Sequence, residues 1–376
     1  MSFLVIGNGF DLHLKIKSSL KDFLTKKVFY KSDNEYRYDG NNLLYYLFYL
    51  RYFNVHAYNY GSFNRVDDND PTWMDVESFI KEIATSKSIF DQFSKAYAVA
   101  TIENDLTVDR YREEYPTNIF ANILKSRKVK QNYVNTNIKR ILLEDLLTFE
   151  NDFKKYLQGQ VNRKRDYGKI SDSFLNNIYV KATNSDLDLL NSDTQIINFN
   201  YTSPQMYAVK CSNVHGTLDG NIVIGYDSTT DFSQNSIFEL SKDWQVIFSG
   251  INADVRNSND GKTIIFYGHS LGEQDYPYFF ELFDIQHILD VKSKSTLVFC
   301  YSVFGTKFEQ KKFLINYQIA IAKLLNSYER FKKGENNKNT IVAKLKSQNR
   351  LRLVRVDWAI YIWFDIIFMP VGILFS

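Results

Sequence analysis

Apolar residues occur along this chain in two patterns, short continuous runs and longer stretches with helical spacing. Residues 2–6 form a continuous apolar run that ends at Gly7 and Gly9. Apolar residues then recur at helical spacing, at Leu12, Ile16, Leu20, Phe23 and Leu24. The pattern predicts a buried strand, a glycine turn and one helix.

Similar apolar runs return in the second half of the chain. Residues 194–202, 221–227, 262–271 and 295–301 are short and rich in β-branched and aromatic side chains. Such runs are typical of parallel strands that are buried on both faces. Helical spacing predicts helices over 41–53, 73–93, 135–158, 276–289 and 308–328.

This order of elements predicts an α/β fold with a doubly wound parallel sheet and a large helical insertion. We expect residues 1–24 and 191–330 to form a discontinuous nucleotide-binding domain, with the helical insertion at 25–190. A linker and basic segment should follow at 331–357, and an apolar C-terminal tail at 358–376. In such sheets, ligands bind beyond the carboxyl ends of the strands.

The composition narrows the class of protein. Apolar residues make up 44% and charged residues 24%, as in a globular protein. A net charge of +3 is too balanced for a general nucleic-acid binder, so no nucleic-acid partner is expected. The two cysteines cannot form a four-ligand zinc cluster or a disulfide framework. No metal and a reducing, cytoplasmic compartment are therefore expected, and the N-terminus lacks a secretory signal pattern.

The C-terminal tail allows two interpretations. Residues 358–375 are apolar except for Asp365, and several basic residues precede them. This pattern resembles a short membrane span with its basic flank on the cytoplasmic side. Asp365 would be costly in a bilayer and Pro370 interrupts a helix, which favours a segment docked on the protein. Membrane association and docking both stay open.

The first candidate site follows the N-terminal strand. Gly7, Asn8, Gly9 and Asp11 stand between a predicted strand and helix, where glycines let phosphates approach backbone N–H groups. Leu12 occupies the place of the third glycine of the dinucleotide motif. A tight turn is the alternative reading, and Asp11 would repel phosphate but could accept a ribose hydroxyl.

Polar residues also follow a later strand. Asn198 and Asn200 lie on one side of the predicted strand end, as ligand contacts or as the residues of an Asx turn. His215 is a candidate general base or a structural histidine. In the insertion, Asp75 and Glu77 are either active-site carboxylates or acids of a first helical turn.

The segment 268–272 fits the nucleophile motif G-x-S-x-G literally. Ser270 would then be a hydrolase nucleophile that needs a histidine later in the chain. The only later histidine, His287, falls inside a predicted helix, so this reading ranks second.

Taken together, these motifs resemble the AbiH family of bacteriophage abortive-infection proteins. The resemblance rests on LVIGNGFDLHLKIKSSLKDFL, WMDVE, LLTFENDFKKYL, NFNYT, VHG, IGY and GHSLGEQDYPYF, and it covers about residues 1–330. It implies a phage-defence effector whose phage trigger is unknown, and a homo-oligomer stays open.

The same motifs resemble, more distantly, the sirtuin-like NAD-binding fold. That resemblance implies phosphate-loop glycines at Gly7 and Gly9, a ribose-holding Asn200 and a catalytic base at His215. It also implies adenosine contacts from Ser270 and Leu271. Asn8 replaces an alanine of the pattern, Thr202 replaces an aspartate, and the C-x-x-C zinc module of protein deacylases is missing.

What remains would be hydrolysis of NAD at its nicotinamide–ribose bond, with Asn200 and His215 as catalytic residues. The expected contacts to NAD, as substrate or ligand, are Gly7, Asn8, Gly9, Asp11, Asn198, Thr202, Ser270, Leu271 and Asp275. A nucleotide-sensing binding module and a membrane-acting effector are the alternatives.

Overall fold

The structure of the chain is a computed structural model. It describes residues 2–32, 35–38, 40–52, 76–85, 123–124, 126–127, 134–184, 190, 192–204, 209–226, 237–249, 262–334 and 340–356.

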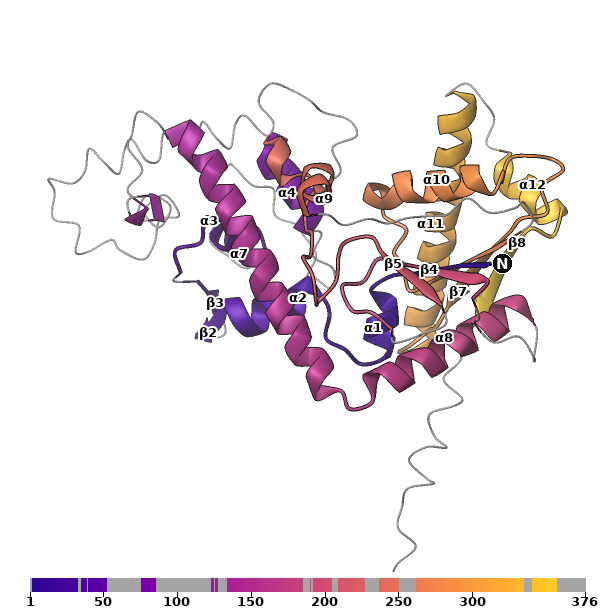
Figure 1. Cartoon of the computed structure of the whole chain (residues 1–376), viewed down its shortest axis with the longest axis horizontal. Coiled ribbons are helices and arrows are strands. Elements are labelled where there is room, and N and C mark those ends of the chain that lie inside the picture. Colours follow the sequence, from indigo (N-terminus) through magenta and orange to yellow (C-terminus); the bar gives the residue numbers. More distant parts are fainter. Residues whose placement is uncertain are drawn as a thin grey trace, which may run out of the picture.

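A parallel sheet of six strands forms the centre of the fold (Figure 1). Its spatial order is β5-β4-β1-β6-β7-β8, and each neighbouring pair is parallel. The strands are β1 (Ser2–Ile6), β4 (Thr194–Asn198), β5 (Lys210–Asn213), β6 (Thr263–Tyr267), β7 (Thr296–Tyr301) and β8 (Leu351–Arg355). Along the chain, β1, β4 and β5 therefore follow one another to one edge of the sheet. β6, β7 and β8 follow one another from the other side of β1 to the opposite edge.

This order creates a topological switch point beside β1. The chain adds β4 and β5 on one side of β1 and then returns to add β6, β7 and β8 on the other. The connections after β1 and β6 leave the carboxyl ends of these strands in opposite directions, which opens a crevice between them. Doubly wound folds bind their ligands in such a crevice.

Helices cover both faces of the sheet. Along β1, Phe3 and Val5 pack into one apolar cluster, whereas Leu4 and Ile6 pack into the other. Helices α10 (Tyr276–Ile285), α11 (Lys307–Lys333) and α12 (Ile341–Ser347) cover the first face. Helices α1 (Gly9–His13) and α8 (Tyr167–Thr183) cover the second. The predicted doubly wound α/β fold is confirmed.

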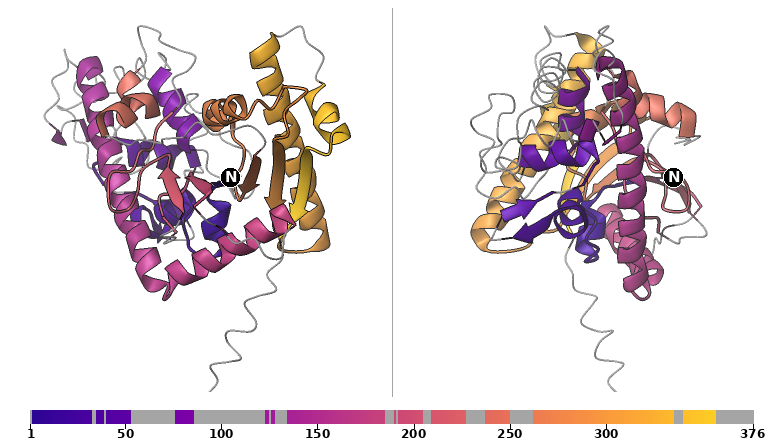
Figure 2. Two further views of the ribbon diagram at one scale, coloured as in Figure 1. Left: turned by 45° about the vertical axis from the view of Figure 1, so that its right-hand side comes forward. Right: turned by 90° about the vertical axis from the view of Figure 1, so that its left-hand side faces the viewer.

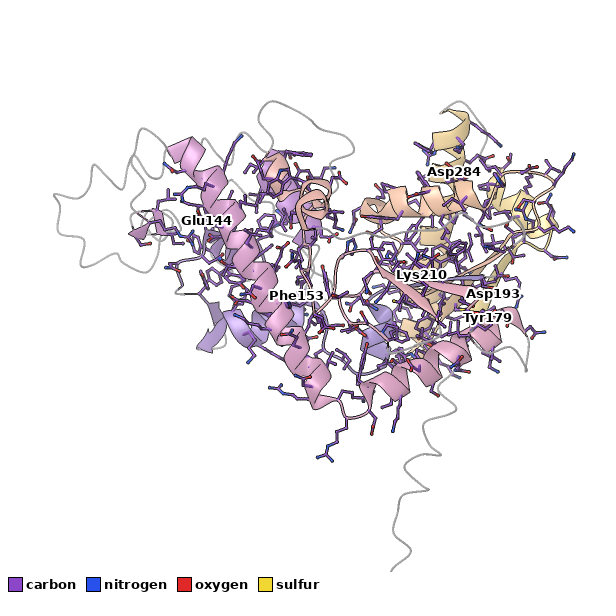
Figure 3. All side chains as sticks on the ribbon, viewed as in Figure 1. Glu144, Phe153, Tyr179, Asp193, Lys210 and Asp284 are labelled. Carbon is purple, nitrogen blue, oxygen red and sulfur yellow. The ribbon has the colours of Figure 1, made fainter. Side chains whose placement is uncertain are left out.

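A mostly helical half stands beside the sheet and has its own apolar core (Figure 2). It is built from α2 (Leu20–Phe23), the π-helix η1 (Leu24–Val28), the hairpin of β2 (Tyr30–Ser32) and β3 (Glu35–Arg37), α3 (Leu43–Tyr52), α4 (Val76–Thr85), α7 (Val134–Arg163), the 3₁₀ turn η6 (Phe238–Leu240) and α9 (Lys242–Ser249). Phe153 of α7 belongs to this core, whereas Tyr179 of α8 packs against the sheet (Figure 3).

Several local predictions were wrong. The single helix expected after Gly9 is broken at Lys15, whose φ of 64° is left-handed, so α1 and α2 are separate. Residues 221–227 were expected to form a strand. The described residues 221–226 make only two isolated bridges, because Ile222, Ile224 and Tyr226 pack into the helical half.

Other predictions concern residues outside those described. They are most of the helix at 73–93, residues 335–339 and 357 of the linker and basic segment, and the whole C-terminal tail at 358–376. Among the described helices, none combines the length and apolar character needed to cross a membrane.

Candidate active site

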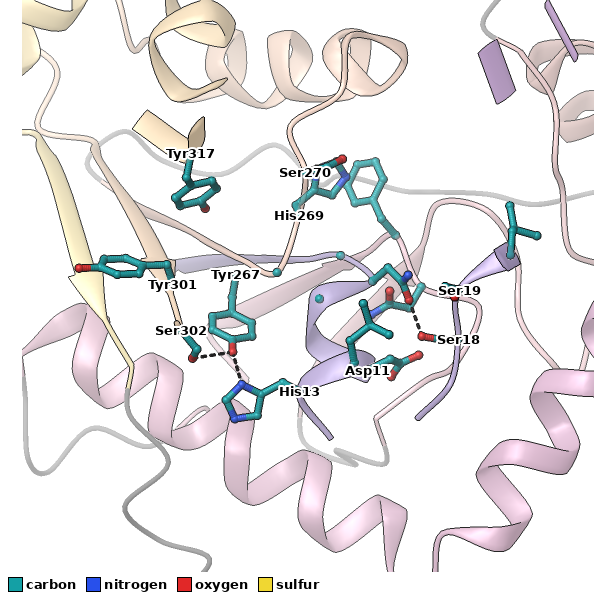
Figure 4. A pocket seen from close by; sticks show the side chains of 18 of the residues that line it. Asp11, His13, Ser18, Ser19, Tyr267, His269, Ser270, Tyr301, Ser302 and Tyr317 are labelled. Atoms are coloured by element: carbon teal, nitrogen blue, oxygen red, sulfur yellow. Dashed lines mark hydrogen bonds between the residues drawn. The ribbon is translucent and has the colours of Figure 1, made fainter. Parts of the chain in front are cut away.

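A large cavity opens at the carboxyl ends of β1, β4, β6 and β7 (Figure 4). Its volume is about 1070 Å³. The sheet loops form its floor, α11 forms one wall, and Val76 and Glu77 of α4 with Phe153 and Leu157 of α7 form another. The cavity therefore lies at the switch point, between the sheet and the helical half.

The glycines after β1 permit a close approach to the turn after β6. A Cβ on Gly7 would lie 2.7 Å from the Cα of His269, and a Cβ on Gly9 would lie 2.7 Å from the Cα of Gly268. The Gly7 N–H donates to the Tyr267 carbonyl at 3.1 Å, and the Gly9 N–H donates to the Gly268 carbonyl at 2.7 Å. These two N–H groups thus join the two loops, and Asn8 accepts a hydrogen bond from Ser18.

The turn after β6 fixes the ring of His269. Gly268 has a φ of +67°, and Leu271 has a φ of 59°, a left-handed conformation that is unfavourable for leucine. In this turn the Leu271 N–H donates to His269 Nδ1 at 2.9 Å. His269 Nδ1 therefore has the lone pair and Nε2 carries the proton. Burial lowers the pKa of His269 to about 4, so the ring is neutral.

Asn200 and His215 line the cavity, and both carry buried polar atoms that have no hydrogen-bond partner among the described residues. These atoms are both amide atoms of Asn200 and Nδ1 of His215, and all three are buried. Leaving a buried polar atom unpaired costs about 1–3 kcal/mol. Such a cluster is typical of a surface built to bind a ligand.

Asn198 holds the turn that presents Asn200. Its Oδ1 accepts the Asn200 N–H at 2.9 Å, and its Nδ2 donates to the Thr202 carbonyl and to Asn213 Oδ1, both at 2.6 Å. Asn198 is thus the Asx-turn residue, and only Asn200 of the two asparagines lines the cavity.

Asp275 lies between two histidines and a lysine. Its Oδ1 is 3.5 Å from His215 Nε2 and 3.7 Å from Lys242 Nζ, and its Oδ2 is 3.4 Å from His269 Nε2. Lys242 Nζ also contacts Glu77 Oε2 at 2.8 Å. Burial raises the pKa of Asp275, but Lys242 and the two histidines outweigh it and hold this pKa below its usual range.

Asp11 lines the cavity, but both of its carboxylate oxygens accept hydrogen bonds from other side chains of the protein. Thr202 Oγ1 donates to Asp11 Oδ2 at 2.7 Å, and Tyr167 OH donates to Asp11 Oδ1 at 3.0 Å. Burial raises the pKa of Asp11 to about 6 despite these two bonds. Thr202 and Leu271 are buried outside the cavity lining and act through Asp11 and His269.

The opposite end of the cavity is aromatic. Tyr267 OH lies 2.6 Å from His13 Nδ1 and 2.9 Å from Ser302 Oγ (Figure 4). Tyr301, Phe304, Phe313 and Tyr317 complete this end. Burial lowers the pKa of His13 to about 4, so this ring is neutral as well. The cavity thus combines a polar end with an aromatic end.

Ser270 also lines the cavity, and it is exposed. Its hydroxyl forms no hydrogen bond with the described residues. His287 lies outside the cavity lining. The geometry therefore offers Ser270 no base in the order that the nucleophile motif requires.

Sequence reasoning missed Lys242 and the aromatic end. Lys242 lies between residues 221–227 and 262–271, in a stretch that shows no motif, and only the fold brings it to Asp275. Glu77 was one of two candidates, and the structure places it in the cavity wall beside Lys242. Asp75 lies outside the described residues.

The fold and the site together define a class: a doubly wound α/β protein with a polar, histidine-containing cavity at its switch point. Comparison with family models then identifies the family. The model described as "Bacteriophage abortive infection AbiH" matches residues 3–300. The chain belongs to the AbiH family of bacteriophage abortive-infection proteins. Comparisons with curated proteins and with solved structures gave no match.

Proposed function

We propose that this chain is a phage-defence effector that hydrolyses NAD at the nicotinamide–ribose bond. One observation carries the proposal: Asn200 and His215, whose buried polar atoms have no hydrogen-bond partner among the described residues, line a cavity at the switch point of a doubly wound fold. Abortive infection is the role of the family, and NAD hydrolysis is the finer step proposed for this member.

The size and lining of the cavity support a dinucleotide. Its volume of about 1070 Å³ lies at the upper end of ligand pockets, which usually measure about 300–1,000 Å³. The aromatic end suits a planar base, and the polar end suits a ribose and a reacting centre. These two ends match the two halves of NAD in chemistry.

The charge at the polar end supports glycosidic bond cleavage. Glu77 and Asp275 are acidic, Lys242 is the one cation among these three, and His269 is neutral. The resulting excess of negative charge would stabilise an oxocarbenium-like transition state. As the C1′–N bond breaks, its electron pair leaves with nicotinamide. A water oxygen bonds to C1′, and its proton passes to His215.

The test is NAD turnover by the purified full chain, with nicotinamide and ADP-ribose measured as products. Wild type should consume NAD, whereas His215→Ala and Asn200→Ala should each lower the rate about 10²- to 10⁴-fold. His287→Ala is the matched control, because His287 is exposed and lies outside the cavity lining. Its rate should equal that of wild type.

Each alternative has its own result. NAD binding without turnover, in the presence of phage lysate as well, would replace the hydrolase with a nucleotide-sensing module. Turnover that persists in both His215→Ala and Asn200→Ala would refute the assignment of the site. Labelling of Ser270 by a fluorophosphonate would revive the serine-hydrolase reading.

A further inference from the structure

Three charged side chains from distant parts of the chain meet beside His215. Glu77 comes from α4, Lys242 from the first residue of α9, and Asp275 from the N-terminal end of α10. The side chain of Lys242 is only 4% exposed and that of Asp275 only 10%. Lys242 is also fixed through its backbone, because its N–H donates to the Tyr226 carbonyl at 2.8 Å.

This arrangement keeps Asp275 ionised although it is buried. An unpaired buried carboxylate would take up a proton, because burial disfavours its charged form. Lys242 Nζ lies 3.7 Å from Asp275 Oδ1 and favours the charged form of this carboxylate. Glu77 Oε2 lies 2.8 Å from Lys242 Nζ and offsets the charge of the lysine. Burial lowers the pKa of Lys242, but Glu77 and Asp275 outweigh it and raise this pKa above its usual range. The three groups therefore carry one net negative charge.

An ionised Asp275 can only accept hydrogen bonds, and two ring nitrogens face it. His269 uses Nδ1 to accept the Leu271 N–H, so its proton is on Nε2, which faces Asp275 Oδ2. His215 turns its own Nε2 toward the other oxygen, Oδ1. Because a carboxylate accepts and cannot donate, a single ring proton of His215 belongs on Nε2. Its Nδ1 then has the lone pair, and Nδ1 is a buried atom without a hydrogen-bond partner among the described residues.

We propose that Lys242 is a positioning residue for the hydrolysis proposed above. Together with Glu77 it keeps Asp275 ionised beside His215 Nε2, 3.5 Å away, which leaves the lone pair of the base on His215 Nδ1. The catalytic part of this inference rests on the proposed function. The tautomer of His215 and the charge network do not depend on turnover of NAD. The helical half thus contributes to the site through Glu77.

The structure describes a small set of charged and titratable groups around His215. Those packed against it or its partners are Asp275, His269, Lys242, Glu77, Tyr201 and Tyr278. Tyr201 is half-buried, and burial with the nearby carboxylates raises its pKa well above 10, so it stays neutral. The charged groups of this set are therefore Glu77, Lys242 and Asp275.

The first readout is the ring ¹⁵N spectrum of the full chain labelled at its five histidines, with His215 assigned by comparison with His215→Ala. Wild type should show His215 protonated at Nε2 and unprotonated at Nδ1. Lys242→Met should lose this single tautomer. Lys323→Met is the matched control, because Lys323 pairs with Glu273 on the surface, 63% exposed, and should leave the spectrum unchanged.

The second readout is the pH dependence of the His215 signal and, where NAD is consumed, of the rate. Glu77→Gln removes one negative charge near the ring, so the titration midpoint of His215 should fall by about one pH unit. For Lys242→Met, kcat should fall at least tenfold with KM changed less than threefold. A merely structural lysine would shift neither the tautomer nor the midpoint.

The outcomes separate this inference from the proposed function. A wild-type His215 protonated at Nδ1, or a midpoint that Glu77→Gln leaves unmoved, overturns the inference whatever NAD does. The expected tautomer and shift in a chain that never cleaves NAD support the network and refute only the hydrolase. If Lys242→Met does not fold, the wild-type spectrum and Glu77→Gln decide the question.

Discussion

Replacing Gly9 with alanine tests the close approach of the two loops that form the cavity floor. The added Cβ would lie 2.7 Å from both the Cα and the carbonyl oxygen of Gly268, well inside van der Waals contact. Both atoms belong to the backbone, so the turn after β6 must move to relieve the clash. Overpacking of this kind costs about 1–3 kcal/mol of unfolding free energy.

The same substitution at Gly159 provides the matched control. Gly159 lies inside α7, and a Cβ there would meet nothing within 4 Å. Gly159→Ala should therefore raise the unfolding free energy by about 0.5–1 kcal/mol through helix propensity. The chemical change is the same at both glycines, so opposite changes in unfolding free energy would come from the different surroundings of Gly9 and Gly159.

Urea unfolding followed by circular dichroism measures both variants on one scale. Gly9→Ala should lower the denaturation midpoint, Gly159→Ala should raise it, and NAD binding by calorimetry should weaken only in Gly9→Ala. If Gly9→Ala is as stable as wild type, the two loops do not pack as described, and the reasoning fails.

Three further predictions follow from individual contacts. The pKa of Asp11 is raised from 3.8 to about 6, so its contribution to stability is lost as pH rises through 6; the change of about two units corresponds to about 3 kcal/mol. Asp11→Asn should remove this loss, which falls between about pH 4 and 6, in urea titrations, and an unchanged pH dependence would contradict it. Thr306 caps α11 in a capping box with Glu309, so Thr306→Ala should cost about 1 kcal/mol in thermal unfolding while NAD binding stays unchanged. Burial raises the pKa of Glu150 from 4.5 to about 8, and Glu150→Gln, which keeps an acceptor for the Ile224 N–H, should flatten the fall in stability between about pH 5 and 8.

The strands that the sequence predicts are those buried on both faces. β1, β6 and β7 are almost entirely apolar, β4 (TQIIN) has Ile196 and Ile197 at its centre, and each lies inside the sheet. The two edge strands were missed. β5 reads KCSN and β8 reads LRLVR, and a strand at an edge needs no continuous apolar run because one side faces solvent. Only the pairing of β5 with β4 and of β8 with β7 reveals them.

The candidate site divides in a similar way. Gly7 and Asn200 follow the strands β1 and β4, whose ends are visible in the sequence because apolar runs stop there. His215 follows the missed strand β5 and Asp275 lies beyond the turn after β6, so the motifs VHG and GHSLGEQDYPYF pointed to them instead. Lys242 could not be found in this way, since its partners lie 165 and 33 residues away along the chain and only tertiary packing joins them. The G-x-S-x-G motif misled in the opposite direction. Residues 268–272 match the motif, but the described geometry provides Ser270 with no base.

The segment that carries His215 depends on the helical half for its position. After His215 the chain passes along α7, where Gln158 Nε2 donates to the Leu218 carbonyl at 2.8 Å and Glu150 Oε1 accepts the Ile224 N–H at 2.7 Å. Two residues further on, Tyr226 pairs with the segment that leads into Lys242.

The same half thus holds the loop that carries His215 and supplies Glu77, the carboxylate beside Lys242. A displacement of α4 or α7 relative to the sheet would separate Glu77 from Lys242 or shift His215, and either change would alter the charges near His215. The helical half is therefore a structural part of the site.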